Sequence, residues 1–285
     1  MSFEDVMGTV MQWQVAGEAL AALGAELTLQ QSGADAPTEI VDALRAVSVA
    51  AGLETDDLAP QQRAIVIGLI HTLLHQSTDL LAEPARAAGW HFVDPVILDG
   101  WGRGSTLVPT LINSVPELQN LKRFLDIGTG VGLLAVAAAG VWPDATIVGI
   151  DIWDPSLERA RANVAGAGLQ DRITLRHQNI TEVYDVDAYD AIWLPSFFMT
   201  EDVLAKGLPN LHRALKPEGH IAFGLMESPP TPLAHAVATL RTIRSGGTQL
   251  DAKRATELLE NAGFTDVHEA EKKAPVPVGL VIGAK

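Results

Sequence analysis

The sequence predicts an α/β fold class, a seven-stranded, mostly parallel sheet with one antiparallel edge strand, preceded by an all-α N-terminal domain. The first hundred residues carry apolar side chains at helical spacing. From about residue 120, short β-branched runs alternate with helical stretches, as in a parallel sheet covered on both faces. Two strand-like runs near the end of the chain are close enough in sequence to form an antiparallel hairpin. We therefore expect two domains, residues 1–100 and 101–285.

The individual elements follow from this periodicity and from the Pro and Gly residues that interrupt it. In the N-terminal domain we expect helices over residues 4–30, 38–51 and 61–81. In the second domain we expect strands over residues 123–127, 146–150, 173–177, 188–194, 220–224, 267–271 and 278–283. The helices between them are expected over residues 131–141, 155–167, 200–215 and 251–262.

Composition and charge exclude several classes of protein. The 285 residues are 47 % hydrophobic and include no cysteine, which excludes disulfides, thiolate metal sites and thiol nucleophiles. The net charge is −15, and the first hundred residues hold 3 basic against 14 acidic side chains, so no nucleic-acid partner is expected. The N-terminus lacks the basic start of a signal peptide, and the longest apolar run is about half of the ~20 residues that a membrane span needs. We expect a cytoplasmic protein with no membrane partner.

A glycine-rich loop between the first strand and the next helix carries the most chemical information. It reads Leu125-Asp126-Ile127-Gly128-Thr129-Gly130-Val131-Gly132. Glycines at a strand-to-helix turn let the backbone approach a ligand closely. Asp151 ends the next strand about 20 residues on, where a carboxylate is well placed to accept from two ribose hydroxyls. A dinucleotide fingerprint would continue with glycine at position 133, where Leu133 stands; another nucleotide-binding α/β domain is the alternative.

The motif D-x-G-x-G-x-G, which Asp126 to Gly132 match at each position, resembles that of the class I S-adenosylmethionine-dependent methyltransferases. The resemblance covers roughly residues 105–285, and the N-terminal helices are placed as in small-molecule O-methyltransferases. It implies a Rossmann-like fold and S-adenosylmethionine as the cofactor. It also implies that residues 1–100 form a helical lid or dimerisation domain, with a homodimer through the N-terminal helices.

The resemblance assigns cofactor roles to single residues. Gly128 and Gly130 would pass beneath the methionine part and the ribose, Asp151 would accept from the ribose hydroxyls, and Asp126 would orient the loop without touching the cofactor. Asn179 stands where many members have aspartate, and its amide oxygen would accept from the adenine amino group. The cofactor residues expected in full are Asp126, Gly128, Gly130, Gly132, Asp151, Ile152 (packed on adenine, with Trp153), Asn179, Ile180 and Arg103 (paired with the methionine carboxylate).

The acceptor is expected to bind after the fourth strand of the sequence, around Trp193-Leu194-Pro195-Ser196-Phe197-Phe198. Leu194 stands where methyltransferases of nucleobase or glutamine nitrogens have a polar residue, which argues against such substrates. No histidine lies between His177 and His212 to act as the base of plant-type O-methyltransferases, and no acid follows the strand, so no metal is expected. We expect a small-molecule acceptor, largely apolar or aromatic, bound by Trp101, Trp193, Phe197 and Phe198.

Two further segments hold candidate functional residues. Three glycines around Trp101 and Arg103 predict an unusual backbone close to a ligand; a flexible hinge with an exposed arginine is the alternative. The catalytic residue is unknown, and its candidates are His71 and His75, which share one helix face, and His91. Each of these histidines has a structural or solvated role as its alternative.

The sequence therefore predicts transfer of a methyl group from S-adenosylmethionine to a small acceptor, at oxygen first, with nitrogen and carbon next. Because the sulfonium already activates the methyl group, positioning and desolvation would supply much of the acceleration. The alternative from another class is an S-adenosylmethionine-binding protein with an interaction or regulatory role and no methyl transfer. The sequence does not specify the acceptor, the general base or the oligomeric state.

Overall fold

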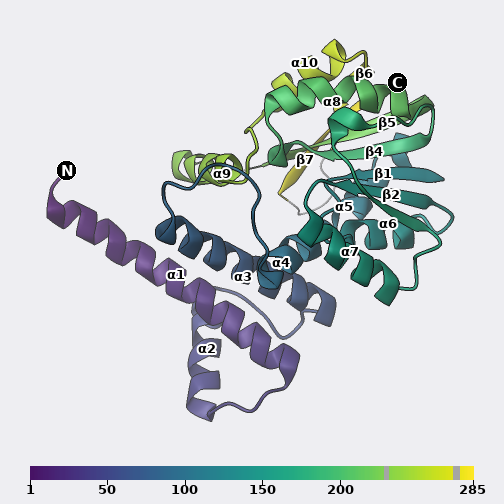
Figure 1. Cartoon of the computed structure of the whole chain (residues 1–285). Helices are drawn as coiled ribbons and strands as arrows, with labels where there is room; N and C mark the ends of the chain where they lie inside the picture. The colour runs from purple at the N-terminus through teal and green to yellow at the C-terminus, as the bar shows by residue number, and fades with distance from the viewer. Residues whose placement is uncertain (228–230, 272–276) are drawn as a thin grey trace. The chain divides into compact units, whose positions relative to one another are not determined.

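The computed structural model describes residues 1–227, 231–271 and 277–285, and the chain divides into two compact units (Figure 1). Unit 1 comprises Met1–Pro84 and Asp94–Gly104. Unit 2 comprises Ala85–Val93 and Ser105–Lys285. The backbone therefore passes from one unit to the other three times, and the short segment Ala85–Val93, which we call the strap, belongs to unit 2 although unit 1 precedes and follows it in sequence.

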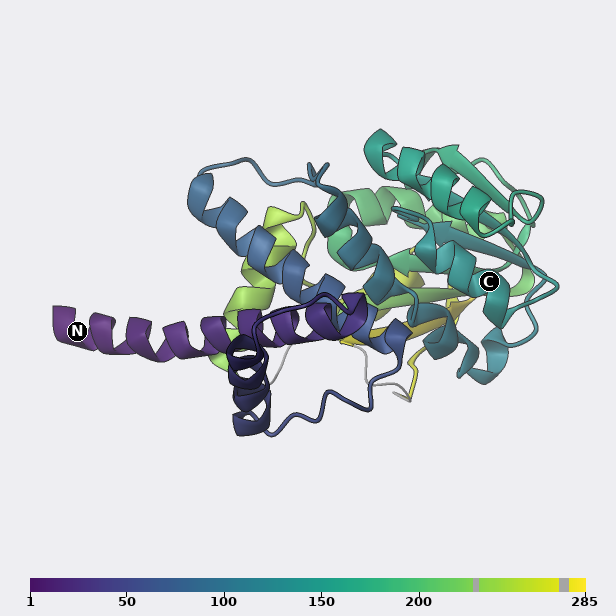
Figure 2. The ribbon, with the colours of Figure 1, turned by 90° about the horizontal axis from the view of Figure 1, so that it is seen from below.

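Unit 1 is helical, as the apolar periodicity predicts. Its elements are α1 (Phe3–Ser32), α2 (Thr38–Ala50), α3 (Pro60–Ala82) and α4 (Pro95–Ser105). A capping box starts α1, in which Asp5 N donates to Ser2 Oγ at 3.2 Å and Ser2 N donates to Asp5 Oδ2 at 2.7 Å. The N-terminal half of α1 runs clear of α2 and α3 in both views (Figures 1 and 2), and residues 1–18 are all exposed.

Helices α3 and α4 cross at a pair of glycines. A Cβ atom at Gly100 would lie 1.9 Å from Thr72 Oγ1 and 2.5 Å from the Gly68 carbonyl oxygen, so only glycine fits there. The glycines of residues 100–104 predicted an unusual backbone, but these residues are part of α4 and none has a positive φ. The physical reason for Gly100 is close contact between helices.

Among the described residues, α3 is the one helix long and apolar enough to cross a membrane. Ile70 of this helix is 3 % exposed, and its Cγ2 would touch a Cβ atom at Gly24 of α1 at 3.0 Å. Of the apolar window of α3, 17 % is buried inside the structure.

Unit 2 is built on the predicted seven-stranded sheet, and the antiparallel hairpin at its edge is confirmed. Strand order is β3-β2-β1-β4-β5-β7-β6; β1 to β5 pair in parallel, and β7 is antiparallel to both β5 and β6. The strands are β1 (Arg123–Ile127), β2 (Thr146–Asp151), β3 (Ile173–His177), β4 (Tyr189–Pro195), β5 (Leu215–Met226), β6 (Thr265–Glu269) and β7 (Val278–Ala284).

Helices cover both faces of this sheet (Figure 1). One face carries α5 (Val108–Asn113), α6 (Leu133–Val141) and α7 (Asp154–Gly166). In the core on this face the rings of Phe124 and Trp142 are tilted at 41°, with their centroids 5.2 Å apart. The other carries α8 (Glu201–Ala214) and α10 (Ala252–Asn261). The sequence did not predict α4, α5 or α9 (Pro232–Arg244), nor the short 3-10 turns η1 (Pro116–Leu118), η2 (Ile180–Glu182) and η3 (Ser196–Phe198).

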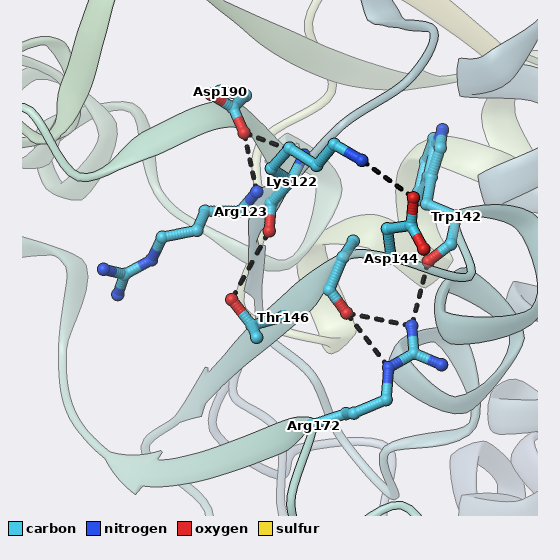
Figure 3. A network of polar contacts seen from close by, with 8 residues as sticks. Lys122, Arg123, Trp142, Asp144, Thr146, Arg172 and Asp190 are labelled. Carbon is cyan, nitrogen blue, oxygen red and sulfur yellow. Dashed lines mark hydrogen bonds and ion pairs between the residues drawn. The ribbon is translucent and has the colours of Figure 1, made fainter.

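A polar network joins the strands at their amino ends (Figure 3). Asp190 Oδ2 accepts from the backbone N–H groups of Lys122 and Arg123 at 2.8 and 2.6 Å. Arg172 donates to the carbonyl oxygens of Ala145 and Trp142, each at 2.9 Å through Nη2. These bonds hold the amino ends of the strands together. In open α/β sheets ligands bind at the carboxyl ends of the strands, so the chemistry is expected at that opposite edge.

Candidate functional site

The glycine loop lies at the carboxyl end of β1, in a conformation that requires its glycines. Gly128, Gly130 and Gly132 have φ values of 64°, 55° and 74°, in the left-handed region that disfavours residues with a Cβ atom. The Thr129 N–H donates to the Ile150 carbonyl oxygen at 3.0 Å, which joins the loop to β2. The loop therefore presents bare backbone at this edge of the sheet.

Gly149 of β2 is a further requirement of the loop that sequence reasoning missed. A Cβ atom at Gly149 would lie 2.6 Å from Thr129 Oγ1, so a larger residue would push the loop away from the strand. Its position in the middle of a strand is the signal, because glycine there marks close approach by another part of the chain.

Asp126 lies beneath the loop and is fully buried. Its Oδ2 accepts from Thr129 Oγ1 at 2.7 Å, and its Oδ1 has no hydrogen-bond partner among the described residues. Burial raises the pKa of Asp126 to about 7; the hydrogen bond from Thr129 opposes this rise, and the charge of nearby Asp151 adds to it. This carboxyl group contacts the loop through Thr129, and its orienting role toward a bound cofactor stays a prediction.

Asp151, at the end of β2, joins the glycine loop to the start of α7. Its Oδ2 accepts from Gly130 N at 2.8 Å, and its Oδ1 accepts from Trp153 N at 2.9 Å. Burial raises the pKa of Asp151, while the hydrogen bonds from the two backbone N–H groups oppose the rise. Each carboxylate oxygen keeps further acceptor capacity, so the group can hold two hydroxyls without losing its backbone bonds.

The residues expected around adenine differ in their exposure and in their hydrogen-bond partners. Ile152 is 61 % exposed and so offers an apolar face. Asn179 Oδ1 already accepts from the N–H and the hydroxyl of Thr181, each at 3.0 Å, and caps η2. Ile180 is 4 % exposed and packs in the core, where its Cδ1 would lie 2.4 Å from a Cβ atom at Gly207. At Ile180, only the backbone is placed to meet a ligand.

The aromatic residues after β4 divide into a buried and a half-buried group. Trp193 is 3 % exposed and covers Gly224 of β5, where a Cβ atom would lie 2.2 Å from Cη2. Phe197 is 8 % exposed, whereas Phe198 is half-buried, and their ring centroids are 4.8 Å apart. Trp193 is thus a core residue of the sheet, and Phe198 is the least buried aromatic side chain of these three.

The strap supplies two aromatic residues that sequence reasoning missed. Trp90 meets Phe198 edge to face at 5.4 Å and 78°, and meets Phe92 edge to face at 5.2 Å and 79°. Trp153 Nε1 donates to the Phe92 carbonyl oxygen at 2.9 Å. The strap therefore contacts both the segment after β4 and the turn that follows Asp151.

Several predicted site residues belong to unit 1. These are Trp101 and Arg103 of α4 and the histidines of α3. His71 and His75 stack at 6.4 Å, and His75 Nδ1 lies 3.2 Å from Asp94 Oδ2. No group of three acidic, histidine or cysteine side chains suited to a metal occurs in the described parts of the chain.

His91 is the histidine candidate in unit 2. Its Nδ1 contacts Arg86 Nη1 and lies 3.3 Å from the Gly89 carbonyl oxygen. A guanidinium only donates, so the Arg86 contact needs an acceptor at Nδ1, whereas the Gly89 carbonyl oxygen needs a donor there. The two contacts therefore do not select one tautomer, and a role of His91 as a base stays a prediction.

A separate cavity of about 710 Å³ lies in unit 2 near the carboxyl end of β5. It is lined by apolar residues and by carboxylates and one histidine, among them Met226, Glu227, His235, Asp251 and Glu269. None of the glycine-loop residues lines it, so this cavity is distinct from the predicted cofactor site.

Comparison with known proteins gives a family match within unit 2. Residues 124–219 match the family described as "Methyltransferase domain". The chain is 46 % identical over 72 residues to the ribosomal protein uL3 glutamine methyltransferase of Bordetella pertussis, covering 25 % of this chain and 24 % of that protein. It is 35 % identical over 115 residues to the demethylmenaquinone methyltransferase of Clavibacter sepedonicus, covering 39 % of this chain and 44 % of that protein. The chain thus spans less than half the length of these curated relatives.

Solved structures match the whole chain at low sequence identity. Human N-acetylserotonin methyltransferase in complex with SAM superposes with a TM-score of 0.70 at 13 % identity, over 100 % of this chain and 99 % of that one. An O-methyltransferase family protein from Burkholderia thailandensis gives a TM-score of 0.70 at 16 % identity, over 100 % of this chain and 98 % of that one. At this identity the likeness establishes the fold.

Proposed function

We propose that this chain, of which residues 124–219 match the family described as "Methyltransferase domain", transfers a methyl group from S-adenosylmethionine to a small acceptor, most readily at oxygen. The observation that carries the proposal is the joint geometry of the glycine loop and Asp151. Three left-handed glycines present bare backbone, and a carboxylate fixed by Gly130 N–H stands beside them. The structural neighbour from human is a complex with SAM, which supports the same cofactor.

The residues present fit this cofactor. A Cβ atom at Gly128 or Gly130 would occupy the space beside the loop, and its absence leaves room for a ligand. In the proposed arrangement Asp151 accepts from the ribose hydroxyls, Ile152 packs on adenine, and Asp126 holds Thr129 and so the loop. When bound, S-adenosylmethionine supplies a methyl group already activated on a sulfonium. The work left to the chain is to bind, to orient the acceptor and to exclude water.

The proposed acceptor is a small molecule with a large apolar or aromatic surface. Phe198 at the carboxyl end of β4 supports an aromatic contact, and the human structural neighbour is named for a small molecule, N-acetylserotonin. The Bordetella relative is named for a protein glutamine, but the chain spans 24 % of it, and Leu194 cannot accept a hydrogen bond from an amide. A nitrogen or carbon acceptor on a small molecule remains the alternative.

The experiment that tests the cofactor is calorimetric titration with S-adenosylhomocysteine. We expect micromolar binding by the wild type and a loss of one to two orders of magnitude in Asp151→Ala, because two charge-assisted hydrogen bonds are worth about 1.5–3 kcal/mol each before compensation. Asp154→Ala is the matched control, since its side chain is 70 % exposed and three residues away. Thermal unfolding of each variant separates lost binding from lost folding. Absence of binding by folded wild type would overturn the proposal.

Turnover separates a methyltransferase from a protein that only binds the cofactor. The proposal names no general base, because positioning alone can supply much of the acceleration. Release of S-adenosylhomocysteine with a phenolic acceptor panel would support catalysis. Binding without turnover across phenols, amines and carbon acids would favour the interaction role.

We also propose that unit 1 acts as a lid or dimerisation domain, with a homodimer through its helices. The support is α1, whose first half exposes large apolar side chains that include Phe3 (74 %), Met11 (55 %) and Trp13 (55 %). Sedimentation velocity of the full chain tests this; a monomer at all concentrations would exclude the dimer. Trp101 and Arg103 remain proposed ligand contacts from this unit, and a cytoplasmic location remains a prediction.

A further inference from the structure

Asp126 combines complete burial with an incomplete set of hydrogen bonds. It is 0 % exposed and lies near the carboxyl end of β1, two residues before the first glycine of the loop. Its Oδ2 accepts from Thr129 Oγ1, whereas its Oδ1 has no partner among the described residues. Burial of an ionised carboxylate is costly unless donors or a positive charge compensate for the lost water. A single hydroxyl donor therefore favours the neutral carboxyl group in the protein without a ligand.

Uncharged residues surround Asp126 within the sheet. Its strand partners are Gly149 of β2 and Trp193 of β4. Side chains alternate along a strand, so Asp126 points to the same face as Phe124, which α5 and α6 cover. Neither of these two helices contains an acidic, basic or histidine residue. These described neighbours therefore supply no positive charge to pair with the carboxyl group.

A second carboxyl group acts on Asp126 through the same loop. Burial raises the pKa of Asp126 to about 7, and the charge of Asp151 adds to the rise. Asp151 itself accepts from two backbone N–H groups, one of them that of Gly130, and the imidazole of His177 favours its charged form. Asp126, with one donor, is thus the member of the pair that holds a proton.

A ligand at the glycine loop would change this balance according to its charge. S-adenosylmethionine carries a sulfonium, an ammonium and a carboxylate, and so a net charge of one positive unit. S-adenosylhomocysteine is the same molecule without the methyl group and without the sulfonium charge. A positive charge held close to a buried carboxyl group favours its ionised form, and this effect is strong where water is excluded.

We propose that Asp126 is a positioning residue that selects the cofactor over its demethylated product by exchanging a proton for the sulfonium charge. The carboxyl group is protonated in the free protein and in the complex with S-adenosylhomocysteine. It is ionised in the complex with S-adenosylmethionine, and its proton goes to the solvent on binding. The inference rests on the proposed function, because it concerns the same cofactor site.

This exchange makes cofactor affinity depend on pH in a defined direction. Because binding of S-adenosylmethionine releases a proton, its affinity rises with pH until the free protein has lost that proton, at about pH 7. The affinity for S-adenosylhomocysteine lacks this contribution. Groups that titrate equally in both complexes cancel in the ratio of the two affinities. We expect the preference for S-adenosylmethionine to grow about tenfold between pH 5.5 and pH 7.0.

The test counts the protons released on binding to the full chain. Calorimetric titration at pH 6.5, in buffers of different ionisation enthalpy, gives this number for each ligand. The probes are S-adenosylmethionine, S-adenosylhomocysteine and sinefungin, which carries an ammonium group in place of the methylsulfonium. We expect S-adenosylmethionine and sinefungin each to release about half a proton more than S-adenosylhomocysteine.

Two variants identify the group that releases the proton. Asp126→Asn cannot ionise, and its amide oxygen can still accept from Thr129, so the three ligands should release equal numbers of protons. Asp144→Asn is the matched control at the amino ends of the strands, where the side chain is 79 % exposed (Figure 3), and should retain the difference. If Asp126→Asn does not fold, Thr129→Val should move the pH dependence upwards, because the lost hydrogen bond favours the ionised form.

The outcomes separate this inference from the proposed function. Equal proton release by S-adenosylmethionine and S-adenosylhomocysteine in the wild type overturns the inference and leaves the proposed function standing. A difference that persists in Asp126→Asn also overturns it, since the proton would then come from another group such as Asp151 or His177. Sinefungin that behaves like S-adenosylhomocysteine overturns the role of charge. A folded wild type that binds none of the three ligands overturns both proposals.

Discussion

Asp126 is a fully buried carboxyl group, and its replacement by asparagine should change how the stability of the protein depends on pH. Burial raises the pKa of Asp126 from 3.8 to about 7 in the folded state. Between these two pH values the folded chain holds one proton more than the unfolded chain, so the free energy of unfolding falls as pH rises and levels off above about 7. The amide side chain of the Asp126→Asn variant cannot ionise, and its oxygen can still accept from Thr129 Oγ1.

The size of the effect follows from the shift. At 1.36 kcal/mol per pKa unit, the wild type should lose about 2–3 kcal/mol relative to Asp126→Asn between pH 5 and pH 8. Urea unfolding of both proteins at pH 5, 6, 7 and 8 measures this difference directly. Groups that titrate equally in both proteins cancel. Parallel stability curves would refute the reasoning, since they would mean that the carboxyl group is ionised in the folded protein throughout this range.

Two further predictions concern backbone strain and the network at the amino ends of the strands. Gly132→Ala should destabilise the protein by about 1–2 kcal/mol, because φ is 74° and the new Cβ would lie 3.1 Å from Ala160 Cβ. Gly140→Ala in α6, with no atom within 4 Å of the new Cβ, should instead stabilise the protein by about 0.5–1 kcal/mol. Calorimetric melting measures both changes in stability, and the same sign of change in both variants would contradict this account. Arg172→Met removes the donor to three carbonyl oxygens and should cost about 2–3 kcal/mol in urea unfolding. A cost below about 0.5 kcal/mol would mean that water replaces those bonds.

The sheet and the glycine loop were predictable because their signals are local. Strands such as β1 and β3 have the predicted bounds, since each is a short apolar or β-branched run between turn residues. The methyltransferase domain predicted from Asp126 to Gly132 agrees with the family match over residues 124–219. The loop carries its own conformational requirement, which only glycine meets without strain.

What the sequence could not predict depends on contacts between distant residues. Glycines at 100, 102 and 104 disfavour a helix by intrinsic propensity, yet α4 forms there, with Gly100 packed against Gly68. Trp90 and Phe198 are more than a hundred residues apart, and neither position has a motif that marks the pair. Trp193 was expected to line the acceptor site, and only the sheet shows that its ring covers Gly224.

The division of the chain into units has a consequence for dissecting the protein into fragments. A cut at residue 105, where the long run of unit 2 begins, would remove the strap together with unit 1. Such a fragment would keep the glycine loop and Asp151 but would leave Phe198 without Trp90, and Trp153 Nε1 without its acceptor. A fragment of residues 85–285 would retain both partners. A difference in stability or binding between these two fragments would therefore report the contribution of residues 85–104, which include the strap. A difference between the longer fragment and the full chain would report the contribution of residues 1–84.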